Sequence, residues 1–269
     1  MTLNLRRVWA IVLRQIFLYG GSPQRVLPLF AWVAVDMVLW GYMTRYLNTI
    51  GPGGMNFVPM LLGAVLLWDF LTRVMQGVTM AFFEDVWSRS FLNIFASPIS
   101  VGEYMLGLIA TGVITSLLGL VAMVALASTV FGLSFLVYGP ALLPFLLVLF
   151  LTGIALGMFG VSLVLRFGPA SEWLIWPIPT LLSPFAGVFY PVTVLPGWMQ
   201  AVSRALPPAY VFEGMRAAVR GQPVSLTGLG VGAGLAVFYV ALGGATFAAV
   251  YRHAIRTGLI ARYSAETLN

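Results

Sequence analysis

Long, uninterrupted runs of apolar residues occupy most of this chain. One run, residues 141–151, reads ALLPFLLVLFL and lacks the period-two alternation of a membrane β-barrel strand. Lipid offers the backbone no hydrogen-bond partners, so such runs must form helices, and about 20 residues suffice to cross a bilayer. The pattern predicts six spans, near Val26–Tyr46, Phe57–Thr79, Gly102–Val130, Pro140–Leu165, Glu172–Tyr190 and Leu226–Tyr251.

Residues 1–22 show a different pattern. Read as a helix, they place three arginines on one side and apolar side chains on the other. The arginines are Arg6, Arg7 and Arg14, and the apolar side chains are Leu5, Val8, Trp9, Val12 and Ile16. This arrangement predicts an amphipathic helix in the membrane interface, with Trp9 buried and the arginines towards the headgroups.

Prolines mark the region around the fifth predicted span. Pro177, Pro179, Pro184 and Pro191 interrupt it, so we expect this span to be kinked or split. The segment that follows, residues 191–224, is too polar and proline-rich to cross lipid and too apolar for an ordinary loop. The remaining connections are too short for a second core, so we expect one membrane domain over residues 1–269.

Composition supports a membrane location and narrows the chemistry. Hydrophobic residues make up 60% of the 269-residue chain and charged residues 8%, against about 25% charged in a soluble domain. The chain has no cysteine, which excludes disulfides and thiolate sites, and no lysine. A phosphate-binding P-loop requires lysine. If the protein is an ATP-driven pump, its ATPase is therefore a separate polypeptide.

The net charge of +6 comes from arginines placed unevenly across the membrane. With both termini in the cytoplasm, the inner side holds Arg6, Arg7, Arg14, Arg25, Arg89, Arg166, Arg252, Arg256 and Arg262, and the outer side holds Arg45, Arg204, Arg216 and Arg220. Cytoplasmic loops are enriched in positive charge. We therefore expect a multi-pass protein of the bacterial inner membrane with cytoplasmic termini, and we explain its charge by topology rather than by nucleic acid binding.

The loop between the second and third spans, residues 84–98, carries a polar stripe. Read as a helix, it aligns Asp85, Arg89 and Asn93 at four-residue spacing next to Glu84, opposite an apolar face. Two interpretations stand: a helix lying at the membrane interface, or a coupling helix that presents Glu84, Asp85, Arg89 and Asn93 to a soluble partner.

Ionisable residues also fall inside predicted spans. Asp36 lies in the first span, and Asp69 and Arg73 lie four residues apart in the second. Such groups are costly in lipid, and they either stabilise helix packing or line a transport path. In the segment 191–224, Glu213 and Arg216 sit three residues apart, as an outer gate or as a stabilising pair.

Two stretches resemble the ABC-2 type permeases of ABC transporters. The first is Glu84–Ser100, which closes on SPIS. The second joins Ser183–Trp198 to Leu206–Arg216, with an LP…E-x-x-R ending. Ala186 stands where that family often has serine or glycine.

The resemblance implies a homodimeric exporter that docks separate ATPase subunits through its amphipathic and coupling helices. It also implies a translocation path along the second and fifth spans, and short re-entrant helices over residues 191–224. Mg–ATP would bind the partner, and this chain would hold no cofactor or metal and catalyse no reaction.

The alternative is a secondary transporter driven by an ion gradient, with Asp36 and Asp69 as cation or proton sites. A membrane-embedded enzyme is disfavoured because no paired catalytic set is visible. The sequence does not choose among drugs, lipids, glycans and peptides as cargo.

Overall fold

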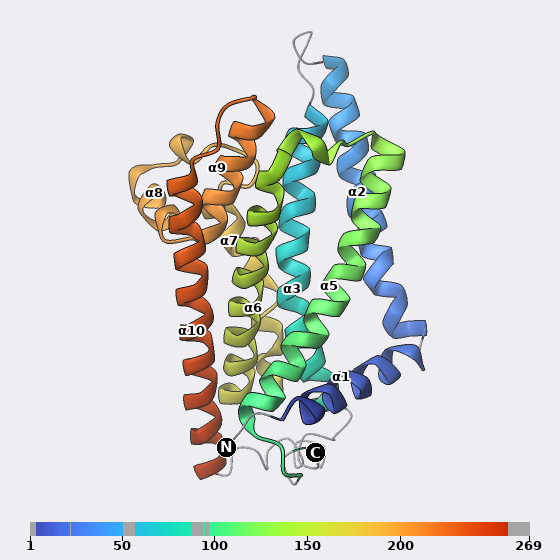
Figure 1. Ribbon diagram of the computed structural model, residues 1–269, viewed down its shortest axis with the longest axis vertical. Coiled ribbons are helices and arrows are strands. Elements are labelled where there is room, and N and C mark those ends of the chain that lie inside the picture. The colour runs from blue at the N-terminus through green and yellow to red at the C-terminus, as the bar shows by residue number, and fades with distance from the viewer. Residues whose placement is uncertain (1–3, 22, 51–56, 88–93, 95–96, 258–269) are drawn as a thin grey trace.

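The computed structural model describes residues 4–21, 23–50, 57–87, 94 and 97–257. Every regular element in these residues is helical (Figure 1). The α-helices are α1 (Leu5–Gly20), α2 (Pro23–Ile50), α3 (Gly63–Trp87), α5 (Val101–Phe131), α6 (Leu142–Phe167), α7 (Pro177–Ala186), α8 (Gly197–Arg204), α9 (Pro207–Val219) and α10 (Leu226–Arg256). A π-helical turn η1 (Val58–Leu62) leads into α3, and 3-10 turns η2 (Phe135–Ala141), η3 (Pro169–Leu174) and η4 (Val192–Val194) lie between later helices.

Among the described residues, four helical segments are long and apolar enough to cross a membrane. They are Val58–Trp87, Val101–Phe131, Phe135–Phe167 and Leu226–Arg256, each close to a predicted span. The prediction of an all-α membrane protein is confirmed. The first predicted span lies in α2, whose 28 residues would extend about 42 Å at the rise of an α-helix.

The predicted fifth span is not a single helix. Its residues form η3 and then α7, which has only ten residues and ends at Gly187 in a left-handed conformation with φ of 62°. At about 15 Å, α7 is half as long as the hydrocarbon core is thick. The prolines therefore divide this segment, as the sequence predicted. Beyond it, η4, α8 and α9 occupy residues 191–224 and lie at the end of the bundle opposite α1 (Figure 1).

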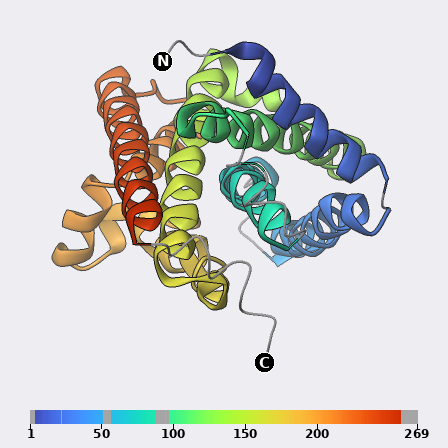
Figure 2. The same cartoon turned by 90° about the horizontal axis from the view of Figure 1, so that it is seen from below.

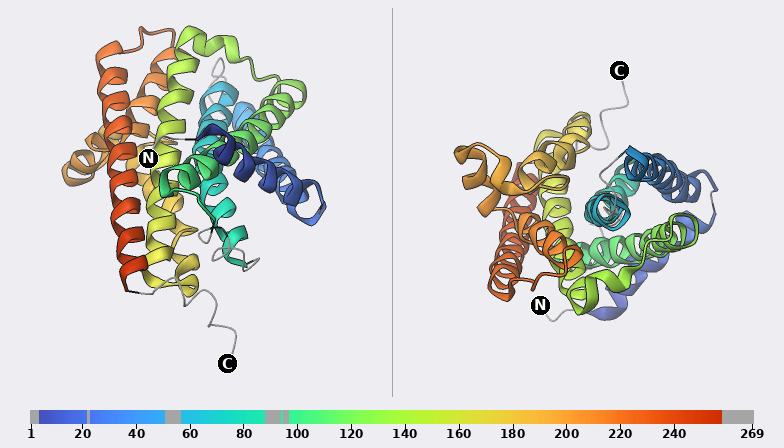
Figure 3. Two further views of the ribbon diagram at one scale, coloured as in Figure 1. Left: turned by 60° about the horizontal axis from the view of Figure 1, so that its bottom comes forward. Right: turned by 90° about the horizontal axis from the view of Figure 1, so that it is seen from above.

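Helix α3 lies at the centre of the bundle, between α2, α5 and α6 (Figure 2). Glycines allow its neighbours to approach closely. A Cβ atom at Gly153 of α6 would lie 2.7 Å from Val74 Cβ, and one at Gly77 would lie 2.7 Å from the Cα of Gly112 in α5. Small residues at such crossings are typical of membrane helix packing. Helix α10 packs on the other side of α6, and α7 to α9 gather beside it, across the bundle from α1 and α2 (Figure 3).

Helix α1 lies across one end of the bundle, at the ends of α5 and α3 (Figures 1 and 2). Ile11, Val12 and Gln15 face the protein, whereas Trp9 is 54% exposed. Residues Leu5–Gly20 are helical as predicted, and Trp9 is turned away from the bundle. The last turns of α6 and α10, with Arg166 and Arg256, lie at the same end of the bundle as α1.

Candidate functional site

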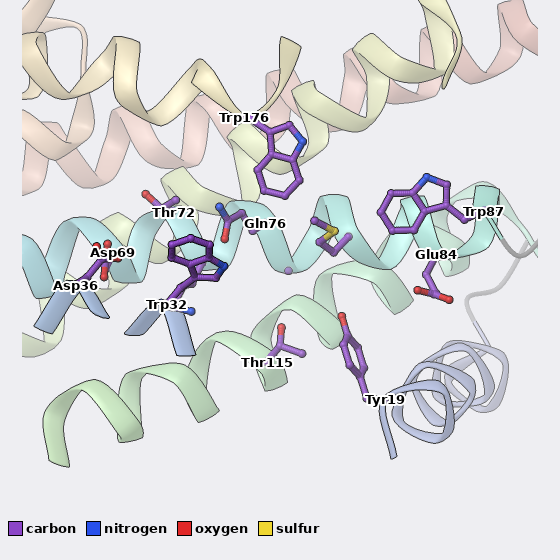
Figure 4. A pocket seen from close by; sticks show the side chains of 13 residues that line it. Tyr19, Trp32, Asp36, Asp69, Thr72, Gln76, Glu84, Trp87, Thr115 and Trp176 are labelled. Atoms are coloured by element: carbon purple, nitrogen blue, oxygen red, sulfur yellow. The ribbon is translucent and has the colours of Figure 1, made fainter. Parts of the chain in front are cut away.

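One face of α3 lines a cavity of about 640 Å³ (Figure 4). This face carries residues spaced three and four apart, namely Asp69, Thr72, Arg73, Gln76, Met80, Glu84 and Trp87. The spacing places them along one side of the helix. From Asp69 to Trp87 the helix rises about 27 Å, which is nearly the thickness of the hydrocarbon core. A polar and aromatic face therefore extends through most of a bilayer.

The three predicted intramembrane charges meet on this cavity. Asp36 of α2 lies beside Asp69 of α3 (Figure 4), and both carboxylates are close enough to Arg73 to interact with its charge. Asp69 Oδ2 is buried and has no hydrogen-bond partner among the described residues. The aliphatic part of Arg73 lies against α5, since a Cβ atom at Gly119 would be 3.0 Å from its Cδ.

Aromatic side chains from four elements complete the lining. Tyr19 comes from α1, Trp32 from α2, Trp87 from α3 and Trp176 from the junction of η3 and α7. The indole N–H of Trp87 also donates a hydrogen bond to the carboxylate of Glu172 in η3. The break in the fifth predicted span thus places Trp176 across from the polar face of α3 (Figure 4).

The position of Asp85 corrects its predicted role. Asp85 lies in the last turns of α3, rather than in a separate helix, and its side chain is fully buried. It accepts hydrogen bonds from Tyr104 Oη at 2.8 Å and Gln15 Nε2 at 3.2 Å, and it forms an ion pair with Arg14. A carboxylate enclosed in this way is not presented to a soluble partner. Glu84 faces the cavity, and Arg89 and Asn93 lie outside the described residues.

A second carboxylate, Glu103, attaches the N-terminal end of α1 to α5. It accepts hydrogen bonds from the backbone N–H of Asn4 at 2.9 Å and of Ser100 at 2.8 Å, and it lies 3.5 Å from Arg7 Nη1. Ser100 and Glu103 form a capping box at the start of α5, a signal readable in the S-x-x-E sequence. The contact between Glu103 and Asn4 joins residues 99 positions apart, so no local pattern predicts it. Glu103 and Asp85 together anchor α1 to α5 and α3.

The Glu213–Arg216 pair joins α9 to the turn after α7. Arg216 is 2% exposed; its Nη2 lies 3.0 Å from Glu213 Oε1, and its Nη1 donates to the carbonyl of Gly187 at 2.7 Å. Glu213 Oε1 also accepts the backbone N–H of Val192 at 2.7 Å. The pair therefore stabilises the chain reversal between α7 and η4.

Replacing Arg216 by methionine is expected to lower the free energy of unfolding by about 1–2 kcal/mol. The cost comes mainly from the Gly187 carbonyl, because Glu213 is 44% exposed and its ion pair contributes little. Thermal unfolding in detergent measures the change. Arg220→Met, at an exposed arginine just after α9, is the matched control. Equal unfolding temperatures for the two variants would contradict the assignment.

Comparison with known proteins places the chain in a family. The sequence profile of the ABC-2 type transporter matches residues 6–219. The chain is 26% identical over 169 residues to Nodulation protein J of Rhizobium meliloti (strain 1021), covering 59% of this chain. It is 26% identical over 173 residues to the inner membrane transport permease YadH of Escherichia coli (strain K12), covering 61% of this chain. Each match spans 63% of the relative's own length. Since the profile covers most of its length, the chain belongs to the ABC-2 type transporter family of membrane transport permeases.

Proposed function

We propose that this chain is the membrane-spanning subunit of an ATP-driven exporter. Two copies enclose the translocation path, and separate ATPase subunits bind Mg–ATP. The observation that carries the proposal is the face of α3 from Asp69 to Trp87, which is polar and aromatic over about 27 Å of an otherwise apolar bundle. Because polar groups in lipid face water or protein, this face suits a path bordered by a second copy.

The attachment of α1 supports a route for coupling. Residues 88–100 lie between α3 and α5 in the sequence, and the carboxylates close to the two ends of this segment, Asp85 and Glu103, both bind α1. An ATPase that docks on this segment would thus move α1, α3 and α5 together. Arg89 and Asn93 stay as proposed docking residues. Glu84 lines the cavity instead, and Asp85 acts from inside by holding α1.

The proposed orientation has the α1 end of the bundle in the cytoplasm of a bacterium. Arginines of α1 and of the last turns of α6 and α10 gather at that end, as expected for a cytoplasmic face. The relative YadH is named as an inner membrane protein. In this orientation the Glu213–Arg216 pair lies at the outer end and serves as the proposed gate.

Reversing the charge of Arg89 tests the docking proposal. Arg89→Glu is expected to reduce co-purification of the ATPase subunit at least about tenfold, if one charge pair of about 1.4 kcal/mol is lost. ATP-dependent export in inverted vesicles should fall with it. Arg204→Glu, at the exposed end of α8 on the opposite side of the bundle, is the matched control and should change neither.

The same vesicles separate the two candidate functions. One observation favours an ion-gradient-driven carrier: the carboxylates of Asp36 and Asp69 line the same cavity. Transport that needs no ATPase and follows an imposed ion gradient would replace the exporter proposal with that alternative.

A further inference from the structure

Acidic side chains gather on the α3 cavity although the chain as a whole is basic. The chain has 14 arginines and 8 acidic residues. Asp36, Asp69 and Glu84 line the cavity, and Arg73 is the one arginine among its described lining residues. Acidic residues therefore outnumber arginines in the cavity, whereas arginines outnumber acidic residues in the chain as a whole.

Elsewhere in the described residues, three carboxylates each form an ion pair with one arginine. Asp85 pairs with Arg14, Glu103 with Arg7, and Glu213 with Arg216. In the cavity, by contrast, Asp36 and Asp69 share the charge of Arg73.

One carboxylate oxygen of Asp69 lacks a hydrogen-bond donor among the described residues. This oxygen, Oδ2, is buried. Carboxylates at membrane depth require compensation. Arg73 brings one positive charge to the two carboxylates of Asp36 and Asp69, so a cation in the cavity would supply the second.

The aromatic residues indicate what kind of cation fits. Trp32 and Trp176 approach the polar face of α3 from different elements, and Trp87 and Tyr19 line the end near α1 (Figure 4). Indole faces attract cations through their π-electrons. A volume of about 640 Å³ falls within the range of 300–1,000 Å³ that holds drug-sized ligands. Within the described residues, no group of three His, Cys, Asp or Glu side chains suits a bare metal ion.

We propose that this cavity binds organic cations whose positive charge is surrounded by aromatic or other apolar groups. The carboxylates of Asp36 and Asp69 balance the charge, and the indoles of Trp32 and Trp176 cover the apolar groups. The proposal that the cavity binds organic cations rests on the geometry of the cavity alone. The assignment of such cations as exported cargo rests on the proposed function.

Binding of tetraphenylphosphonium to the full-length protein tests the proposal. The protein is held in nanodiscs of zwitterionic phosphatidylcholine, and empty nanodiscs give the background for equilibrium dialysis. We expect saturable binding of tetraphenylphosphonium and none of tetraphenylborate, which has the same shape and the opposite charge. Asp69→Asn and Trp176→Leu are each expected to weaken binding about tenfold.

Trp198→Leu is the matched control, because Trp198 in α8 is exposed and lies outside the cavity. It should leave binding unchanged. Trp176 is 45% exposed, so its replacement does not disturb the core and gives a result even if Asp69→Asn folds poorly. Equal binding of both ions, or binding that survives both cavity substitutions, overturns the proposal.

Transport in vesicles distinguishes this proposal from the exporter function. Saturable tetraphenylphosphonium binding without any ATP-dependent export would uphold the site and reject the exporter. ATP-dependent export of an anionic or uncharged cargo, with no tetraphenylphosphonium binding, would uphold the exporter and reject the cation site.

Discussion

Replacing Asp85 by alanine is expected to lower the free energy of unfolding by about 3 kcal/mol and to detach α1 from the bundle. The carboxylate is fully buried and holds three groups, Arg14, Gln15 and Tyr104, from two other helices. Alanine leaves the fully buried Tyr104 hydroxyl and the partly buried Arg14 guanidinium without their acceptor. Unfolding in detergent measures the first effect, and hydrogen exchange of the α1 amides measures the second.

Two further variants make the Asp85 result specific. Asp85→Asn keeps an oxygen acceptor for Tyr104 and Gln15, so its cost should lie between those of the wild type and Asp85→Ala. Arg6→Ala, at an exposed arginine in the same helix α1, should change the free energy of unfolding by less than about 0.5 kcal/mol. If Asp85→Ala leaves exchange of α1 unchanged, the carboxylate does not hold this helix.

Most of the membrane-crossing helices could be predicted from apolar run length, but the end of α3 could not. The predicted second span stopped at Thr79, because Glu84 and Asp85 looked like the start of a polar loop. In the structure α3 continues to Trp87 and buries Asp85. Carboxylates are almost never fully buried unless paired. The partner Arg14 lies 71 residues earlier in the chain, so the pairing has no local signal.

For the candidate site, the sequence predicted which residues share a face of one helix, but not which helices bring their residues together. The spacing of Asp69 and Arg73 placed both on one face of α3, as the structure has them. That Asp36 joins them depends on how α2 crosses α3, which hydrophobic periodicity does not specify. Trp176 reaches the cavity because the chain breaks between η3 and α7, and the prolines predicted the break but not its direction.

Replacing Gly77 by alanine is expected to cost about 3 kcal/mol, since its added Cβ meets backbone that cannot move aside. That Cβ would lie 2.7 Å from Gly112 Cα, 3.0 Å from Gly112 O and 2.8 Å from Thr115 Oγ1. Helix α3 is packed on its other side by α6, so it cannot retreat from α5 without losing those contacts. Unfolding of the purified protein in detergent measures the cost.

A glycine-to-alanine control at another position distinguishes the steric clash from the general effect of alanine on helix stability. A Cβ at Gly234 of α10 meets no atom within 4 Å, so Gly234→Ala should be neutral or stabilise the helix by up to about 1 kcal/mol. Gly112→Ala meets Val78 N at 2.9 Å across the same crossing and should destabilise like Gly77→Ala. Because both glycines serve one contact, the double variant should cost less than the sum of the two. Equal stability of Gly77→Ala and Gly234→Ala would show that α3 and α5 do not meet at this crossing.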